Sequence, residues 1–252
     1  MPRSGASSKA TAAAENAVAA MIGRGAQGAE LARALVAQGI TTRAHLKRPD
    51  VISRLPRDAR ASVLFNPVRR IALPVAQAIS DEACRRLSFS LGGRARQLEV
   101  IPVGGVRRES AVVKDIDLLV VVPGDAAETT LATARLRAPR PGDSLSIVDT
   151  YAAGSRRRSF ILEDAQSGKR YKADLFVTTA REKAYALYHH TGSAAYNIRI
   201  RAFAKRQGWK LNQYGLFVSA TGHPVPRSTL VKTEAQLAKL LGVTFREPRD
   251  RT

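Results

Sequence analysis

The stretch that decides the fold is Lys114-Asp115-Ile116-Asp117-Leu118-Leu119-Val120-Val121-Val122, in which two aspartates enter an apolar run. The run is typical of a buried strand, and a buried strand does not ordinarily carry two carboxylates. Because side chains alternate along a strand, Asp115 and Asp117 point the same way, about 7 Å apart. Burying two like charges without a counterion is heavily penalised, so the pair predicts a divalent-cation site.

A Gly-Gly turn and paired arginines precede the aspartates, in Val103-Gly104-Gly105-Val106-Arg107-Arg108. Gly104 and Gly105 allow the backbone to approach a phosphate closely, with N–H groups facing the anion. Arg108 is better placed than Arg107 for bidentate contact with a phosphate, because Arg107 faces the other way on an extended or turning segment. The combination predicts a nucleotidyltransferase site, where cations and arginine hold a nucleoside triphosphate.

A third carboxylate, Asp174, lies in the predicted strand 170–177, and we expect that strand to be an antiparallel neighbour of the first. Phosphoryl transfer by two metals needs ions about 3.5 to 4 Å apart, and three carboxylates can bridge such a pair. Asp115 and Asp117 would hold both ions with the triphosphate, and Asp174 would complete the ion that activates a primer 3′-hydroxyl. Carboxylates without His or Cys favour Mg²⁺, with Mn²⁺ as the second choice. The alternative is that these aspartates cap turns or pair with arginine.

The charge of the chain predicts a polyanionic partner. Its 252 residues hold 41 Lys and Arg against 21 Asp and Glu, for a net charge of +20 and a pI of about 11.1. Residues 1–88 carry 14 basic and 6 acidic side chains, residues 89–180 carry 14 and 11, and residues 181–252 carry 13 and 4. This distribution suits a metal-bearing centre between two regions that bind a phosphate backbone. Architectural nucleic-acid binders share the excess of basic over acidic residues, so the net charge by itself also fits that class.

Cysteine, histidine and hydropathy exclude several classes of protein. The single Cys84 excludes an internal disulfide, and no apolar run approaches the roughly 20 residues that span a bilayer. We therefore expect a soluble intracellular monomer with no membrane contact. The four histidines and the cysteine lack the spacing of a zinc site; the histidines are His45, His189, His190 and His223.

Periodicity and turn residues predict an α+β protein in four parts. These are a disordered tail at 1–17, a helical DNA-binding part at 18–88, a catalytic part at 89–180 and a C-terminal part at 181–252. Helices are expected near 55–65, 73–88, 182–188, 194–207 and 234–241, the last capped by Thr233. Strands are expected near 98–103, 116–122, 146–151, 158–162, 170–177 and 214–218.

Residues 18–40 read as two helices joined by the turn Ile22-Gly23-Arg24-Gly25. Such a turn resembles a helix-hairpin-helix, in which N–H groups at a helix start hold a DNA phosphate. Gly23 and Gly25 are therefore candidate DNA-binding residues.

Three motifs in order resemble those of the family X DNA polymerases. The first is Gly104-Gly105-Val106-Arg107-Arg108 with Asp115-Ile116-Asp117; the second is Lys172-Ala173-Asp174-Leu175. The third runs from His189-His190-Thr191-Gly192-Ser193 through Tyr196-Asn197 to Arg201. The resemblance extends over about residues 20 to 250 and is strongest to a short viral member, so we expect a large DNA virus as the source.

The resemblance implies a polymerase beta-like palm with a mixed or antiparallel sheet, flanked by a helix-hairpin-helix subdomain and a small α+β C-terminal subdomain. It implies a DNA-directed DNA polymerase that fills short gaps in base excision repair, acting on gapped or nicked duplex DNA and dNTP, with a DNA ligase as a further partner. A viral enzyme of this kind would work in the host cytoplasm or nucleus.

The resemblance also assigns roles to residues. The metal ligands would be Asp115, Asp117 and Asp174. The nucleotide-binding residues would be Gly104, Gly105, Arg108, Arg70, His189, His190, Gly192 and Asn197. The DNA-binding residues would be Gly23, Gly25, Arg201 and Lys205.

Several residues depart from the family pattern. Gly105 replaces the usual Ser and loses a hydroxyl contact to phosphate, Lys114 replaces a small residue, and His189-His190 replaces Tyr-Phe. The region before residue 20 is too short for a lysine-bearing lyase domain, so we expect no sugar-phosphate lyase activity. Two rival functions share these features: a template-independent nucleotidyltransferase shares the acidic site, and a non-catalytic DNA-binding protein shares the charge.

Overall fold

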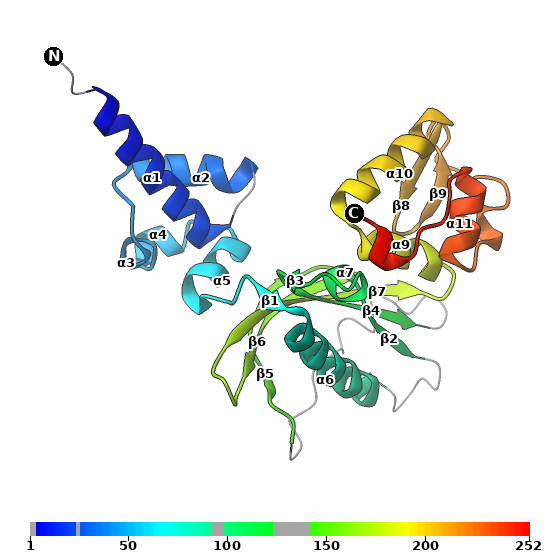
Figure 1. Ribbon diagram of the computed structural model, residues 1–252, viewed down its shortest axis with the longest axis horizontal. Coiled ribbons are helices and arrows are strands. Elements are labelled where there is room, and N and C mark those ends of the chain that lie inside the picture. The colour runs from blue at the N-terminus through cyan, green and yellow to red at the C-terminus, as the bar shows by residue number, and fades with distance from the viewer. Residues whose placement is uncertain (1–3, 24–25, 92–97, 123–141) are drawn as a thin grey trace. The chain divides into compact units, whose positions relative to one another are not determined.

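The computed structural model describes residues 4–23, 26–91, 98–122 and 142–252. The chain divides into two compact units, Met1–Pro67 and Val68–Thr252 (Figure 1). Each unit has hydrophobic core residues of its own. Across the described ranges, no helix combines the length and the apolar character needed to cross a bilayer.

The first unit is helical. Its helices are α1 (Ser4–Ile22), α2 (Ala26–Ala37), α3 (Arg43–Leu46), α4 (Pro49–Ile52) and α5 (Arg57–Phe65). Their apolar faces meet in a core that includes Val18, Ile22, Leu35, Leu46 and Val63.

Helix α1 corrects the expectation of a disordered tail at 1–17. It begins at Ser4, and its first half is rich in alanine, the residue with the highest helix propensity. Its second half buries Val18 and Ile22, which anchor the helix to the core. Alanine-rich polar sequence therefore forms a helix here because one end of it is packed.

The second unit contains a five-stranded sheet in the order β2-β4-β7-β6-β5 (Figure 1). The strands are β2 (Glu99–Pro102), β4 (Ile116–Val122), β5 (Leu145–Ala153), β6 (Arg157–Asp164) and β7 (Arg170–Thr179). A two-residue strand β1 (Ile71–Ala72) pairs with β3 (Val112–Val113). Helix α6 (Leu73–Leu91) packs on one face of the sheet, so it belongs with the second unit and not with the helical part in which the sequence placed residues 73–88.

The pairing of β4 with β7 is parallel, which corrects our expectation of an antiparallel neighbour. Strand β6 runs antiparallel to both β5 and β7, so β7 returns in the direction of β5. The expectation was wrong because spacing along the chain does not reveal how many reversals separate two strands. The sheet is therefore mixed, which is one of the two arrangements that the family resemblance implied.

Alternation along the strands divides their side chains between two packed faces of the sheet, one of which also carries the aspartates. Ile116, Leu118 and Val120 of β4 pack in the same core as Ala173 and Leu175 of β7. This core also contains the buried face of α6, formed by Ala76, Ile79, Ala83 and Leu87. Because successive side chains point to opposite faces, Asp117 and Asp174 emerge on the face away from α6.

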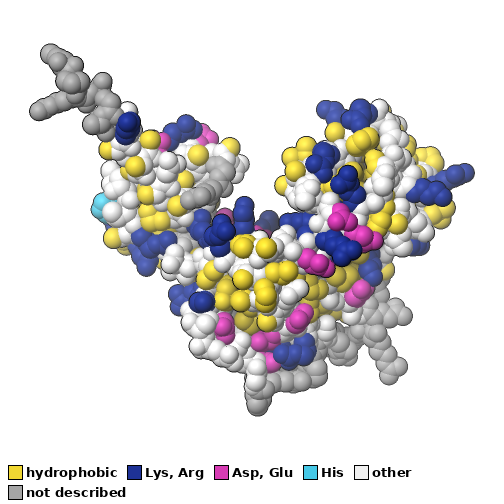
Figure 2. All heavy atoms as spheres, viewed as in Figure 1, with side chains coloured by type: hydrophobic (Ala, Val, Ile, Leu, Met, Phe, Trp, Pro, Cys, Tyr) yellow, Lys and Arg dark blue, Asp and Glu magenta, His cyan; other side chains and the backbone are white. Residues whose placement is uncertain are grey.

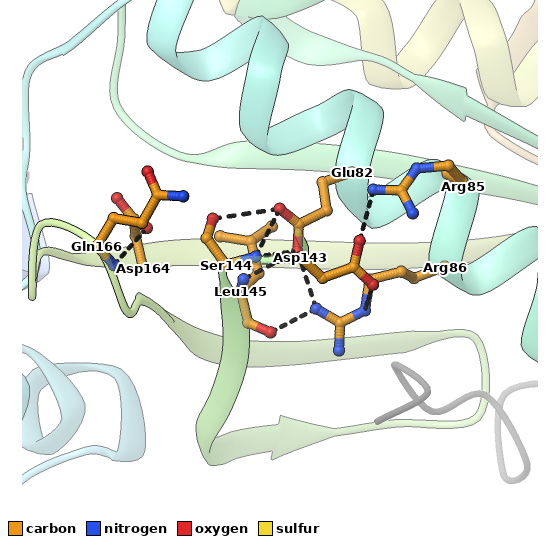
Figure 3. Close-up of polar contacts among 8 residues, drawn as sticks. All are labelled: Glu82, Arg85, Arg86, Asp143, Ser144, Leu145, Asp164 and Gln166. Atoms are coloured by element: carbon orange, nitrogen blue, oxygen red, sulfur yellow. Dashed lines mark hydrogen bonds and ion pairs between the residues drawn. The ribbon is translucent and has the colours of Figure 1, made fainter. Parts of the chain in front are cut away.

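A polar cluster ties α6 to the start of the edge strand β5 (Figure 3). The Glu82 carboxylate accepts hydrogen bonds from the backbone N–H groups of Ser144, at 3.1 Å, and Leu145, at 2.8 Å. Arg86, which is buried, pairs with Glu82 at 3.0 Å and donates to the Leu145 carbonyl. The start of β5 is thus held by charge-assisted hydrogen bonds, which are stronger than neutral ones.

The C-terminal part of the second unit has a separate core. Its elements are α9 (Lys183–Thr191), α10 (Ala194–Arg206), β8 (Trp209–Asn212), β9 (Gly215–Val218), α11 (Glu234–Leu241) and the 3₁₀ helices η1 (Ser228–Leu230) and η2 (Pro248–Asp250). The predicted Thr233 cap is confirmed: its side chain accepts from the Gln236 N–H at 3.1 Å. Strand β8 was not predicted; it pairs with β9 across a tight turn in which Asn212 accepts from the Gly215 N–H at 3.1 Å.

Candidate active site

The three aspartates singled out in the sequence lie together. Asp115 immediately precedes β4, Asp117 is its second residue, and Asp174 lies in the middle of β7. Each offers a carboxylate oxygen, and these three oxygens all lie within 4.8 Å of one another. The parallel register causes this, since it places Asp117 directly opposite Asp174.

Burial and mutual repulsion disfavour the ionised forms of Asp115 and Asp117. Burial raises the pKa of Asp117 well above its ordinary value, and Asp115 and Asp174 raise it further, against the attraction of Arg157 and Arg108. Burial and Asp174 likewise raise the pKa of Asp115. Three converging carboxylate oxygens, with no His or Cys among them, fit a hard divalent cation such as Mg²⁺.

Two neighbours on β6 hold Asp174. The buried Ser159 hydroxyl donates to one carboxylate oxygen, and the Arg157 guanidinium lies 2.9 Å from the other. Both come from the strand next to β7, where Ser159 is directly opposite Asp174. The sequence predicted this strand only from about residue 158, whereas β6 begins at Arg157.

Two glycines form the start of the short helix α7 (Gly104–Arg107), and each is required by a different neighbour. Gly104 has a φ of +60°, and a Cβ built there would lie 2.0 Å from an Asp117 carboxylate oxygen. A Cβ at Gly105 would lie 2.6 Å from a methyl carbon of Val113. Gly105, which replaces the serine usual in the family, therefore leaves room for the side chain of Val113 on β3.

The two arginines that follow both contact Thr191 but otherwise have different neighbours. Arg107 forms a double hydrogen bond with Glu234 of α11, at 2.5 and 3.0 Å, and contacts the Thr191 hydroxyl at 2.5 Å. Arg108 donates to the Thr191 carbonyl. Burial lowers the pKa of Arg108, while Asp117 and Asp115 oppose that shift. Arg107 thus links α7 to α9 and α11, and Arg108 is left beside the aspartates.

A cavity of about 470 Å³ opens beside the acidic cluster. Its lining includes Asp115 and Asp117 and most of the residues predicted to bind the nucleotide, namely Gly104, Gly105, Arg108, His189, His190, Gly192 and Asn197. Arg70 is not among the described lining residues; it is exposed and directly precedes β1. The volume falls in the range of natural ligand pockets.

The His-His pair forms one wall of the cavity. The His190 ring stacks on Phe176, with ring centroids 3.9 Å apart. Burial lowers the pKa of His190 to about 3 and that of His189 to about 4, so both rings are neutral near pH 7. Asn197 donates to the His189 carbonyl at 2.7 Å, and Arg201 lies 2.7 Å from the His189 ring nitrogen Nδ1.

Sequence reasoning missed Phe176 and Lys114, which also line the cavity, and Arg157 beside the acidic cluster. Alternation could have found Phe176, because it lies two residues after Asp174 and shares its face. Lys114, which directly precedes Asp115, was noted in the sequence only as a departure from the family pattern and not as a residue of the cavity.

None of the described residues predicted to bind DNA belongs to the cavity lining, although Arg201 contacts the lining residue His189. Arg201 and Lys205 are exposed on α10, and Figure 2 shows basic side chains over the lobe that contains this helix. Gly23 ends α1 with a φ of +133°, in the first unit, whereas Gly25 lies outside the described residues.

Known proteins resemble the chain in sequence. Residues 186–252 match the family model described as DNA polymerase beta thumb. Repair DNA polymerase X of African swine fever virus (isolate Pig/Kenya/KEN-50/1950) is 37% identical over 185 residues, which cover 72% of this chain and 99% of that protein. The same-named protein of isolate Tick/Malawi/Lil 20-1/1983 is 37% identical over 170 residues, 66% of this chain and 90% of that protein.

Two polymerases of lower sequence identity are also similar to the chain. DNA polymerase lambda of Rattus norvegicus is 27% identical over 161 residues, 60% of this chain and 28% of that protein. Leishmania infantum polymerase beta, solved as a ternary P/T complex, has the same fold, with a TM-score of 0.72 at 18% identity over 96% of this chain and 99% of that one. The chain therefore belongs to the family X DNA polymerases, which are metal-dependent nucleotidyltransferases.

Proposed function

We propose that the protein is a DNA-directed DNA polymerase that transfers dNMP from dNTP to a primer 3′-hydroxyl and fills short gaps during base excision repair. The observation that carries this proposal is the convergence of Asp115, Asp117 and Asp174 within 4.8 Å beside a cavity that Arg108 also lines. A carboxylate cluster next to an arginine-lined pocket suits the transfer of a phosphoryl group.

The three aspartates would hold the divalent cations, with Mg²⁺ as the first choice because the donor set consists of carboxylate oxygens. Bound cations would lower the pKa of the primer hydroxyl and neutralise charge on the triphosphate. The aspartates themselves are fixed on neighbouring strands of the sheet, which holds their oxygens in a constant arrangement.

The cavity would receive the nucleotide. Arg108 would bind the triphosphate, and the glycines Gly104 and Gly105 would let backbone N–H groups approach it. Asn197 would face the base or its sugar edge, with the stacked pair His190 and Phe176 beside it. The neutral state of His190 at pH 7 suits packing rather than charge recognition.

Duplex DNA would be bound through its backbone. Arg201 would contact the template strand and Lys205 the DNA, both from the exposed side of α10, whereas Arg70 would contact a phosphate of the nucleotide. In the first unit, Gly23 and Gly25 would present N–H groups to a DNA phosphate as in a helix-hairpin-helix. Filling a one-nucleotide gap leaves a nick, so a DNA ligase would act on the product.

The test is extension on a gapped duplex with Mg²⁺, supplying each dNTP separately and changing the template base. Wild-type protein is expected to insert the complementary nucleotide only. Asp117→Asn and Asp174→Asn are expected to abolish insertion and to retain DNA binding. The matched control is Asp164→Asn, which changes an aspartate at the end of β6 outside the acidic cluster.

Normal extension by Asp117→Asn or Asp174→Asn would contradict the assignment of the site. Insertion that ignores the template base would instead identify a template-independent nucleotidyltransferase. Absence of any incorporation by the wild-type protein on gapped, nicked and single-stranded substrates would leave only a DNA-binding role.

A further inference from the structure

Lys114 adds a positive charge to the cavity beside the acidic cluster. It follows the short strand β3 and directly precedes Asp115. Val113 is buried in the core that contains α6, whereas Lys114 is exposed and lines the cavity. Because neighbouring residues of an extended segment point to opposite sides, the burial of Val113 directs Lys114 away from that core and towards the cavity.

Within the described ranges, the Lys114 ammonium has neither a hydrogen bond nor an ion pair with another side chain. Burial and Asp174 raise the pKa of Asp115, and Lys114 opposes that rise, so its charge acts on the acidic cluster. Arg157, which also opposes it, is bound to Asp174 at 2.9 Å. Lys114, in contrast, can bind an anionic ligand without giving up an existing ion pair.

The cavity has two chemically different parts. Rings and an amide from β7, α9 and α10 line the aromatic part, namely Phe176, His190 and Asn197. Helix α7 and the residues that follow it line the basic part, namely Gly105, Arg108 and Lys114. Rings and an amide suit a nucleoside, whereas cations and glycine backbone suit its phosphates.

The two cations of the basic part lie at different places in it. Arg108 is beside the aromatic part, because it donates to the Thr191 carbonyl of α9. Lys114 is beside Gly105, because the preceding residue Val113 packs against that glycine: a Cβ at Gly105 would lie 2.6 Å from a Val113 methyl carbon. Position 105 therefore has no room for a side chain of its own, and the side chain that can reach a phosphate there is Lys114.

We propose that Lys114 binds the terminal phosphates of the nucleotide, so that Arg108 and Lys114 hold the triphosphate at two separate points. This rests on the proposed function, in which the primer 3′-oxygen bonds to the α-phosphorus and pyrophosphate leaves. Lys114 also holds the pyrophosphate product, because that product consists of the same two phosphates. A lysine ammonium on a flexible stem can follow both the bound triphosphate and the leaving product, whereas a guanidinium fixes one orientation.

The first experiment measures binding of inorganic pyrophosphate, dATP and dAMP, each with Mg²⁺, to the full-length protein without DNA by isothermal titration calorimetry. Lys114→Gln is expected to weaken binding of pyrophosphate and dATP about three- to tenfold, the size of one charge-assisted contact at a partly exposed site. Binding of dAMP is expected to stay unchanged, because dAMP lacks those phosphates. Lys114→Arg keeps the charge and is expected to stay close to wild type.

The matched control is Lys172→Gln. Lys172 also opposes the rise in the pKa of Asp115, but it does not belong to the described cavity lining and lies over the Tyr151 ring, 5.3 Å from the centroid. Both substitutions remove one positive charge near the acidic cluster, so both are expected to bind Mn²⁺ slightly more tightly, as followed by electron paramagnetic resonance. Only Lys114→Gln is expected to lose pyrophosphate affinity. Equal losses of pyrophosphate affinity would show a general effect of charge and exclude a direct contact.

The second experiment measures single-nucleotide insertion on a gapped duplex, with and without added pyrophosphate. Lys114→Gln is expected to raise the KM for dNTP and the inhibition constant of pyrophosphate by the same factor, about three- to tenfold. The loss is expected in KM rather than in kcat, because the contact is present both before and after the transfer. A lower kcat with unchanged KM and unchanged inhibition by pyrophosphate would contradict the proposal.

Pyrophosphate affinity of Lys114→Gln equal to that of wild type would overturn the inference, and so would wild-type protein that binds dATP but no pyrophosphate. These failures are distinguishable from failure of the proposed function. If Asp117→Asn loses insertion while Lys114→Gln binds pyrophosphate and dATP as wild type does, only the role of Lys114 is wrong. If Asp117→Asn inserts nucleotides normally, the assigned site itself is wrong.

Discussion

Asp117 and Asp174 lie directly opposite each other on the parallel strands β4 and β7. Neighbouring strands are about 4.8 Å apart, so the sheet holds these two carboxylates close together whether or not a cation is present. The same backbone geometry that positions these carboxylates for a cation therefore also makes them repel each other in the cation-free protein. This repulsion lowers the stability of the fold, and substitutions that remove one of the charges can measure by how much.

Asp117→Asn is expected to stabilise the cation-free protein. Burial, Asp115 and Asp174 raise the pKa of Asp117, so ionising it is unfavourable in the fold, and a neutral amide removes that cost. The expected gain is on the order of 1 kcal/mol, or about 2–4 °C in melting temperature for a chain of this size. Thermal melts in EDTA at pH 7 measure it.

The control for that measurement is Asp164→Asn. Hydrogen bonds led by the Ser167 hydroxyl lower the pKa of Asp164, so its charge is favoured and its loss is expected to destabilise the protein. A lower melting temperature for Asp117→Asn in EDTA would show that the cluster is not repulsive.

Gly105→Ser is expected to lower stability even though serine is the usual residue of the family at this position. The added Cβ would lie 2.6 Å from a Val113 methyl carbon, and a β-branched side chain on a strand has little freedom to move. The expected cost is about 1–3 kcal/mol by urea denaturation. The double variant Gly105→Ser/Val113→Ala is expected to recover part of it; additive losses would exclude this contact as the cause.

Glu234→Ala is expected to destabilise the protein by about 3–5 kcal/mol. Glu234 is buried between Arg107, at 2.5 Å, and the fully buried Arg251, at 2.8 Å, so its removal leaves Arg251 without its carboxylate. Urea denaturation measures the loss. Glu247→Ala, which removes an exposed carboxylate, is the control, and a similar small effect for both variants would contradict a structural role for Glu234.

Stability is expected to fall as the pH falls from about 6.5 towards 4, partly because of His190. Burial lowers its pKa from 6.5 to about 3, so over this range the unfolded chain binds a proton that the folded protein does not. The contribution of the neutral His190 ring to the free energy of unfolding is therefore complete above pH 6.5 and falls progressively below it. At pH 5 the loss is on the order of 1 kcal/mol.

His190→Phe is expected to flatten this dependence while keeping the stack on Phe176. Urea denaturation at pH 7, 6 and 5 compares the two proteins. Parallel pH profiles for variant and wild type would show that His190 does not contribute.

Much of the molecule could be predicted from short-range patterns. The apolar run with two aspartates identified β4, and the Thr233 cap located α11, because both signals are local. The order of the motifs along the chain also predicted that Asp115, Asp117 and Asp174 belong to one site. The sequence-based assignments of Arg70, Arg201 and Lys205 are not tested by the geometry and stay predictions.

The tertiary structure alone decided how the strands combine. It made β4 and β7 parallel, placed Asp117 opposite Asp174, brought Arg157 from β6 against Asp174 and set Val113 against Gly105. Each of these contacts joins residues far apart in the chain, and its existence depends on strand order and register. A local pattern specifies which face a residue takes within its own strand, but only packing of the whole sheet against α6 selects which strands become neighbours.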